Sequence, residues 1–219
     1  GSLQPLARKA GDAAIAAHMP HYGAAFRAAI SAPIPKALVI ARGWQSKGRL
    51  RADAAAELSV FAGSPEMRRE QIAAAAHIAE QAYHEAAAWA RARGQDAPNQ
   101  QTFLWFFDLL VQNGGLKGLR LSDVRGFIAQ WGEGHAGDAV CDWLAAREAP
   151  QFGYRDCRKN AALWRDRAGA EGLDLFVLSY LRAMKSSAVS QGAVLNRKGT
   201  LALGHGWVNG KIRDLALPH

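Results

Sequence analysis

The feature that most constrains the fold of this chain is an almost wholly apolar stretch near its middle, from Phe103 to Val111. It contains one carboxylate, Asp108, and is followed by the amides Gln112 and Asn113 and two glycines. An apolar run that stops at glycine predicts a buried helix with a glycine C-cap. Asp108 and Gln112 then share one face, because residues four apart are neighbours. A buried carboxylate needs partners, so this face is either a polar seam in the core or the floor of a cleft.

The composition is that of a globular protein. With 219 residues, the chain is long enough for a single domain spanning 1–219. A hydrophobic content of 49% and a charged content of 21% argue against long disordered tracts. No apolar run approaches the roughly 20 residues of a bilayer span, and no signal peptide pattern opens the sequence. We therefore expect no membrane span.

The charge balance favours a polyanionic partner. The chain has 27 Lys and Arg against 19 Asp and Glu, a net charge of +8. Nucleic acid, anionic lipid and anionic cell-wall polymer would all be attracted to such a surface. The basic residues are scattered rather than gathered in a run, which argues against nucleic acid. Two cysteines allow at most one internal disulfide, and the apolar setting of Cys141 favours a free buried thiol.

The periodicity of apolar residues predicts a mainly α fold, with short irregular or β-like pieces at the two ends. A helix start is clearest at Ser64-Pro65-Glu66, where Ser64 is the expected N-cap. The segment Pro33-Ile34-Pro35 predicts an extended connector. We expect a glycine-spaced loop over 132–137 and a compact, glycine-punctuated segment over 196–210. The remaining predicted helices span 3–18 with a break at Gly11, 51–61, 65–93, 121–131, 138 onward, 154–168 and 172–185.

The sequence predicts no metal or cofactor. The nearest approach to a metal-ligand cluster is His77, Glu80, His84 and Glu85 on the long helix. Their spacing differs from that of the two-histidine zinc helix, so we interpret them as a partly solvated face. The terminal glycines lack the spacing of a P-loop or a dinucleotide-binding turn.

Three stretches together resemble a family of bacterial and phage cell-wall hydrolases related to chitosanases, in the lysozyme superfamily. Phe107 to Gly115 is similar to the Phe-Asp-x-x-Val-Gln-Asn-Gly-Gly segment of that family. Gly63-Ser64-Pro65-Glu66 with Gln71 looks like the helix leading into that segment. The third stretch, Arg197 to Leu201 with Gly204 to Gly210 and Asp214-Leu215, looks like the closing Arg-Lys, Gly-x-Gly-x-Val-x-Gly and Asp-Leu pattern.

The resemblance implies a lysozyme-like helical domain that cleaves the glycan strands of peptidoglycan. It implies substrate-cleft residues at Gln4, Asp108, Gln112, Asn113 and Arg197. In such enzymes the general acid is an early glutamate, followed by a segment ending in Gly-Ser/Thr-Leu-Gln-Pro-Leu, which this chain matches at its first six residues. The catalytic acid would therefore lie ahead of Gly1, and no catalytic residue is assigned.

An antibacterial effector or phage lysin would act in the periplasm or at the cell wall of a target bacterium. The partners that the resemblance implies are peptidoglycan glycan strands, a missing N-terminal segment, delivery machinery and an immunity protein. Two alternatives remain open. One is a non-catalytic cell-wall or partner-binding module. The other is a helical nucleic-acid-binding domain, which rests on charge alone.

Overall fold

The computed structural model describes residues 3–147, 152–167 and 170–215. Within these ranges the protein is mainly α-helical, with two short two-stranded sheets, which confirms the predicted fold class. The chain divides into two compact units, Gly1–His77 and Ile78–His219, called unit 1 and unit 2 below. The boundary falls within helix α6 (Pro65–Ala92). The two units are described separately, and a single domain over 1–219 stays a prediction.

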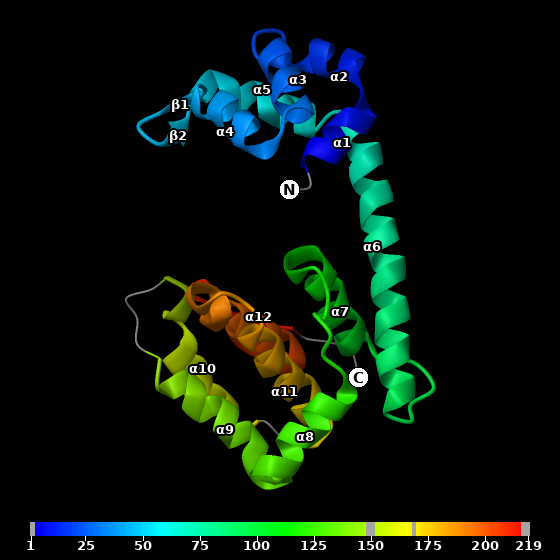
Figure 1. The fold of residues 1–219 in the computed structure, drawn as a ribbon, viewed down its shortest axis with the longest axis vertical. Coiled ribbons are helices and arrows are strands. Elements are labelled where there is room, and N and C mark those ends of the chain that lie inside the picture. Colours follow the sequence, from blue (N-terminus) through cyan, green and yellow to red (C-terminus); the bar gives the residue numbers. More distant parts are fainter. Residues whose placement is uncertain (1–2, 148–151, 168–169, 216–219) are drawn as a thin grey trace. The chain divides into compact units, whose positions relative to one another are not determined.

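Unit 1 is a helical cluster with one β-hairpin (Figure 1). Strands β1 and β2 pair antiparallel, with Gln45 opposite Leu50. Its core gathers Phe26, Trp44 and Phe61, and the ring centroids of Phe26 and Phe61 lie 5.4 Å apart. The elements are α1 (Leu3–Ala10), α2 (Asp12–His18), α3 (Gly23–Ser31), α4 (Ile34–Arg42), β1 (Gln45–Ser46), β2 (Arg49–Leu50), α5 (Ala52–Ala62) and the first part of α6.

The extended connector predicted at Pro33-Ile34-Pro35 is wrong from Ile34 onward, although Ala32 and Pro33 are extended, with ψ 156° and 150°. Helix α4 begins at Ile34 and holds Pro35 in its first turn. The first-turn N–H groups of a helix have no intrahelical acceptor, so a proline there sacrifices no hydrogen bond. The predicted break at Gly11 is confirmed, and so is the start of α6, where the Ser64 hydroxyl accepts from the Met67 backbone N–H at 3.3 Å.

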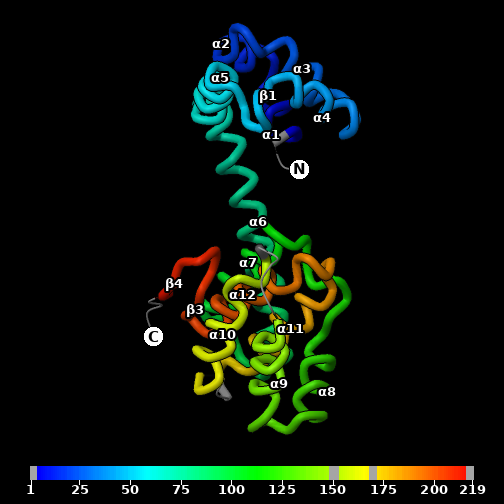
Figure 2. Tube along the Cα trace, turned by 90° about the vertical axis from the view of Figure 1, so that its left-hand side faces the viewer, coloured from blue at the N-terminus to red at the C-terminus, as the bar shows by residue number. Residues whose placement is uncertain are grey.

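Unit 2 packs its helices around α11. This helix contacts α8, α9 and α12, and the core gathers Trp105, Phe106, Trp164 and Phe176. The terminal hairpin, β3 with β4, lies beside α10 and α12 (Figure 2). The elements after α6 are α7 (Gln100–Asn113), α8 (Leu121–Trp131), α9 (Glu133–Ala145), η1 (Phe152–Tyr154), α10 (Cys157–Trp164), α11 (Ala170–Met184), η2 (Ala188–Ser190), α12 (Gln191–Leu203), β3 (His205–Val208) and β4 (Lys211–Asp214).

Two glycine-rich segments are more helical than the sequence predicts. The loop expected over 132–137 is wrong beyond Gly132, because α9 begins at Glu133 and buries Ala136 and Gly137. Helix α12 likewise continues through Gly199 to Leu203. A Cβ at Gly199 would lie 2.6 Å from the Trp164 ring, so the glycine serves close packing rather than a turn. Tertiary contacts thus outweigh the low helix propensity of glycine.

No helix among the described residues has the length and apolar character needed to cross a membrane. Both cysteines are free and buried. Burial raises the pKa of the Cys141 thiol to about 12 and that of Cys157 to about 11. Neither thiol is therefore a reactive nucleophile at neutral pH.

Candidate functional site

The candidate site forms where α7 packs against α12 in unit 2. Helix α7 starts at Asn99, whose side-chain oxygen accepts from the Thr102 backbone N–H at 2.8 Å. It ends at Gly114, which adopts the left-handed conformation with φ 65° and ψ 37°. This conformation is costly for residues with a Cβ, which explains the glycine. The predicted buried helix with a glycine C-cap is confirmed.

Asp108 lies at the centre of an ion cluster that joins the two helices. Its Oδ1 accepts from Arg197 Nε at 2.6 Å and lies 2.5 Å from Arg197 Nη2. Its Oδ2 accepts from Lys198 Nζ at 2.7 Å. Both carboxylate oxygens therefore contact a cation, which is the compensation that burial demands. We call Asp108, Arg197 and Lys198 the ion triad.

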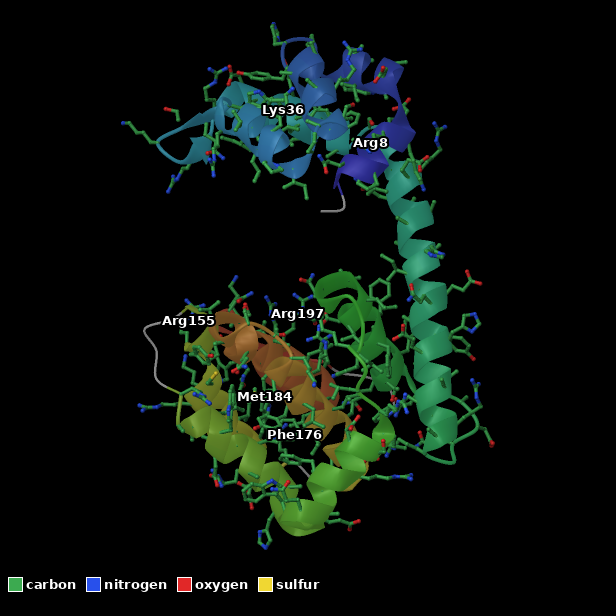
Figure 3. All side chains as sticks on the ribbon, in the orientation of Figure 1. Arg8, Lys36, Arg155, Phe176, Met184 and Arg197 are labelled. Carbon is green, nitrogen blue, oxygen red and sulfur yellow. The ribbon has the colours of Figure 1, made fainter. Side chains whose placement is uncertain are left out.

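The two cations of the ion triad differ in their environment. The Lys198 side chain is 1% exposed, and its ammonium also donates to the Trp105 carbonyl at 3.3 Å. Burial lowers the pKa of Lys198 to about 8, a shift that the nearby Asp108 charge partly offsets. The Arg197 side chain is 44% exposed. The ion triad thus presents one guanidinium to solvent, held by a carboxylate. Figure 3 labels Arg197 among the side chains of unit 2.

A second arginine closes the end of α7. The Arg182 side chain, on α11, is almost fully buried and donates to the Asn113 carbonyl at 2.7 Å and the Gly115 carbonyl at 2.8 Å. The last carbonyls of a helix lack intrahelical donors and carry the negative end of its dipole. Arg182 therefore holds the segment that contains Gln112 and Asn113 against the core.

The structure brings some of the predicted cleft residues together. Asp108 and Arg197 are bonded, and Gln112 and Asn113 follow in the last turn of the same helix α7. Gln112 is exposed and Asn113 is half-buried. Gln4 belongs to unit 1, where its amide donates to the Ala29 carbonyl at 3.2 Å. Whether any of them contacts a substrate stays a prediction.

Sequence reasoning missed two residues of this region. The sequence did point to Lys198, because it is adjacent to the predicted cleft residue Arg197. No local pattern, however, shows which of the two basic side chains is buried. The signal for Arg182 was weaker: it is the one basic residue in the segment that forms α11, and it follows an apolar run. A buried arginine is rare without acceptors, and its acceptors here lie 67 and 69 residues away along the chain.

The acid pair Asp53 and Glu57 on α5 binds the turn between α2 and α3. The Tyr22 hydroxyl donates to Asp53 at 2.8 Å, and this bond lowers the pKa of Asp53. Glu57 accepts from the backbone N–H groups of His21 and Tyr22. A carboxyl group with a lowered pKa is a poor proton donor at neutral pH, so Asp53 does not act as a general acid there.

The pair Asp138 and Asp142 on α9 binds Arg165. Its guanidinium lies 3.5 Å from Asp138 and 2.6 Å from Asp142. These are surface ion pairs, and they suggest no catalytic role. In the described part of the chain no group of three metal-binding side chains comes together.

Comparisons with family models, with curated proteins and with solved structures gave no match to this chain.

Proposed function

We propose that this chain is the helical body of a glycoside hydrolase of the lysozyme superfamily, which cleaves the glycan strands of peptidoglycan. The observation that supports this proposal is the ion triad. It joins the α7 and α12 segments, which carry two of the three stretches that resemble the cell-wall hydrolases. Segments 89 residues apart in sequence thus form one polar cluster, as residues of a shared site would.

In this proposal the Arg197 guanidinium contacts the cell wall, and Asp108 orients that guanidinium. A guanidinium suits the carboxylates of peptidoglycan, since it offers several donors in a fixed plane. Asp108 accepts a hydrogen bond from Arg197 Nε and lies within ion-pair distance of Nη2, which orients that plane before a ligand arrives. Gln112 and Asn113, at the adjacent helix end, would offer amide groups to sugar hydroxyls. The protein would act at the cell wall or in the periplasm of a target bacterium.

Asp108 itself is not the proton donor of the reaction. Glycoside hydrolysis needs a protonated carboxyl group beside the leaving oxygen and a second carboxylate as nucleophile or base. Both Asp108 oxygens already accept from cations. No catalytic acid is assigned among the described residues.

Hydrolysis is tested by incubating the chain with purified peptidoglycan and identifying the released fragments by mass spectrometry. Fragments with a new reducing N-acetylmuramic acid end would show muramidase chemistry and a catalytic acid within this chain. The matched variants are Arg197→Gln and Arg91→Gln, which remove the same charge from unit 2. Arg91 is exposed on α6. Loss of product with the first variant and retention with the second would support the proposed role of Arg197.

A second candidate is a non-catalytic module that binds the cell wall. The contacts of Asp108 with two cations favour this candidate, because they give the buried carboxylate of α7 a structural role. In this case the chain would sediment with sacculi and release no fragments.

A further inference from the structure

Unit 1 contains an apolar groove to which the proposed function assigns no role, although Gln4, one of the predicted cleft residues, is among its lining residues. Its volume is about 340 Å³. Phe26, Ile30 and Leu58 line it from α3 and α5, and Trp44 lines it from the start of the hairpin. Leu50, on β2, also lines the groove. The groove is a feature of the unit 1 fold alone.

Helix α4 forms one wall of this groove with a regular stripe. The lining residues Ile34, Ala37, Leu38 and Ala41 follow the i, i+3, i+4, i+7 spacing of one helix face. Yet α4 buries none of its residues, and Ile34 and Leu38 are 64% and 51% exposed. A helix normally buries its apolar stripe, and a contiguous exposed apolar patch marks an interaction site.

The chain around the groove is strongly basic. Residues 13–52 contain six Lys and Arg and no Asp or Glu. Arg51 is engaged by Tyr22 and Asp53, whereas the side chains of four others are exposed. These four are Lys36, Arg42, Lys47 and Arg49; Figure 3 labels Lys36 among the side chains of unit 1. Exposed basic side chains therefore accompany the groove lining along α4 and the hairpin, while Asp53 and Glu57 of α5 are paired within unit 1. The complement of this groove is apolar on one side and acidic on the rest.

We propose that this groove binds an acidic amphipathic helix of a partner protein. The ridge of a helix enters a groove and places its own i, i+3, i+4, i+7 residues against Phe26, Trp44 and Leu58, which is a common mode of peptide recognition. A flat anionic membrane would contact Ile34 and Leu38 but would leave the groove lining uncovered. A second copy of this chain would bring two basic regions together, which is unfavourable.

The proposal is tested with the full 219-residue chain and a fluorescein-labelled peptide, by fluorescence anisotropy. The probe is a designed helical peptide with Leu at i, i+3, i+4, i+7 and Glu at the outward positions. A basic control replaces each Glu with Lys, and a scrambled control keeps the composition without the stripe. Binding of the acidic peptide alone, weakening as salt is raised, is the expected result.

The matched variants are Leu38→Ser and Ile72→Ser. Both residues are exposed and belong to unit 1, at 51% and 70%, but Ile72 lies on α6 and is not part of the groove. Leu38→Ser is expected to weaken peptide binding about tenfold, and Ile72→Ser to leave it unchanged. Circular dichroism of both variants checks that they remain folded.

Four outcomes would overturn the proposal. They are absence of binding by the acidic peptide, equal binding of the basic peptide, and equal sensitivity of binding to the two serine variants. The fourth is a different occupant of the groove. Flotation with phosphatidylserine vesicles that Leu38→Ser abolishes, without peptide binding, would indicate a membrane. Sedimentation showing dimers that Leu38→Ser dissociates would indicate a second copy.

Discussion

Replacing Asp108 with asparagine should destabilise unit 2 severely. The substitution keeps the size of the side chain but removes the charge that both Arg197 and Lys198 contact. The new amide has one acceptor oxygen, so its NH₂ group must face one of the two cations, donor against donor. The variant therefore loses at least one of the two bonds and all of the charge compensation.

The two cations contribute unequally to the expected loss. Arg197 is 44% exposed and turns to solvent, so its share is under about 1 kcal/mol. Lys198 is 1% exposed and keeps the Trp105 carbonyl and the face of the Trp105 ring, 4.9 Å from its ammonium, but no charged partner. Removing one partner of a buried ion pair costs about 3–5 kcal/mol. Since Lys198 has a pKa already lowered to about 8, it relieves part of this cost by releasing its proton. We expect a loss of about 3 kcal/mol.

The assay is guanidinium chloride unfolding at pH 7, followed by circular dichroism and tryptophan fluorescence. The matched control is Asp142→Asn, which removes the same charge from a side chain 68% exposed and paired with Arg165. Its expected cost is under about 1 kcal/mol. Adding Lys198→Met to the Asp108 variant should recover about 1 kcal/mol or more, because no uncompensated charge remains buried. A loss at Asp108 no larger than that at Asp142 would refute the reasoning.

Three further predictions follow from the packing of unit 2. Gly199→Ala should lower the unfolding free energy by about 1–3 kcal/mol, because the new Cβ would overlap the Trp164 ring. Gly126→Ala has open space around it and should stabilise α8 by up to about 1 kcal/mol. Similar changes in the two variants, measured by chemical denaturation, would contradict this packing. The buried Lys198 has a lowered pKa, so between pH 8 and 10.5 the unfolded chain binds a proton that the folded chain has released, and stability from this group should rise by up to about 3 kcal/mol. Unfolding curves of the wild type minus those of Lys198→Met isolate the rise, and a flat difference over that window would contradict it. Arg182→Met should expose the end of α7 and cost about 2–4 kcal/mol, with faster amide exchange in the last turn of that helix; unchanged exchange there would be inconsistent with the capping role.

Local patterns predict most of the helices correctly. Apolar periodicity, the Ser64 cap and the Gly114 stop are local signals, and each has the structural outcome expected of it. The prediction fails where a distant contact decides the conformation. Gly199 lies inside α12 rather than in a turn, and its missing side chain leaves room for the ring of Trp164, 35 positions earlier in the chain. No window around Gly199 contains that information.

The candidate site is predictable in part. A carboxylate inside an apolar helix needs a hydrogen-bond or ion-pair partner, so Asp108 by itself predicts that a partner lies nearby. The resemblance suggested Arg197 near the cleft, and the structure pairs it with Asp108. The sequence does not show that Lys198 is the buried cation, nor that Arg182 caps α7, because both follow from how α11 and α12 pack. The groove of unit 1 is also a product of packing between α3, α4 and α5.

The most direct test of the proposed role of the ion triad is a binding measurement with purified sacculi. The wild type, Arg197→Gln and Arg91→Gln are sedimented with sacculi over a range of protein concentrations at fixed salt. We predict that Arg197→Gln binds at least fivefold more weakly than the wild type, whereas Arg91→Gln, with the same net charge, binds as the wild type does. Equal weakening by both variants would mean that net charge alone drives association. Absence of binding by the folded wild type would contradict a cell-wall function for this chain.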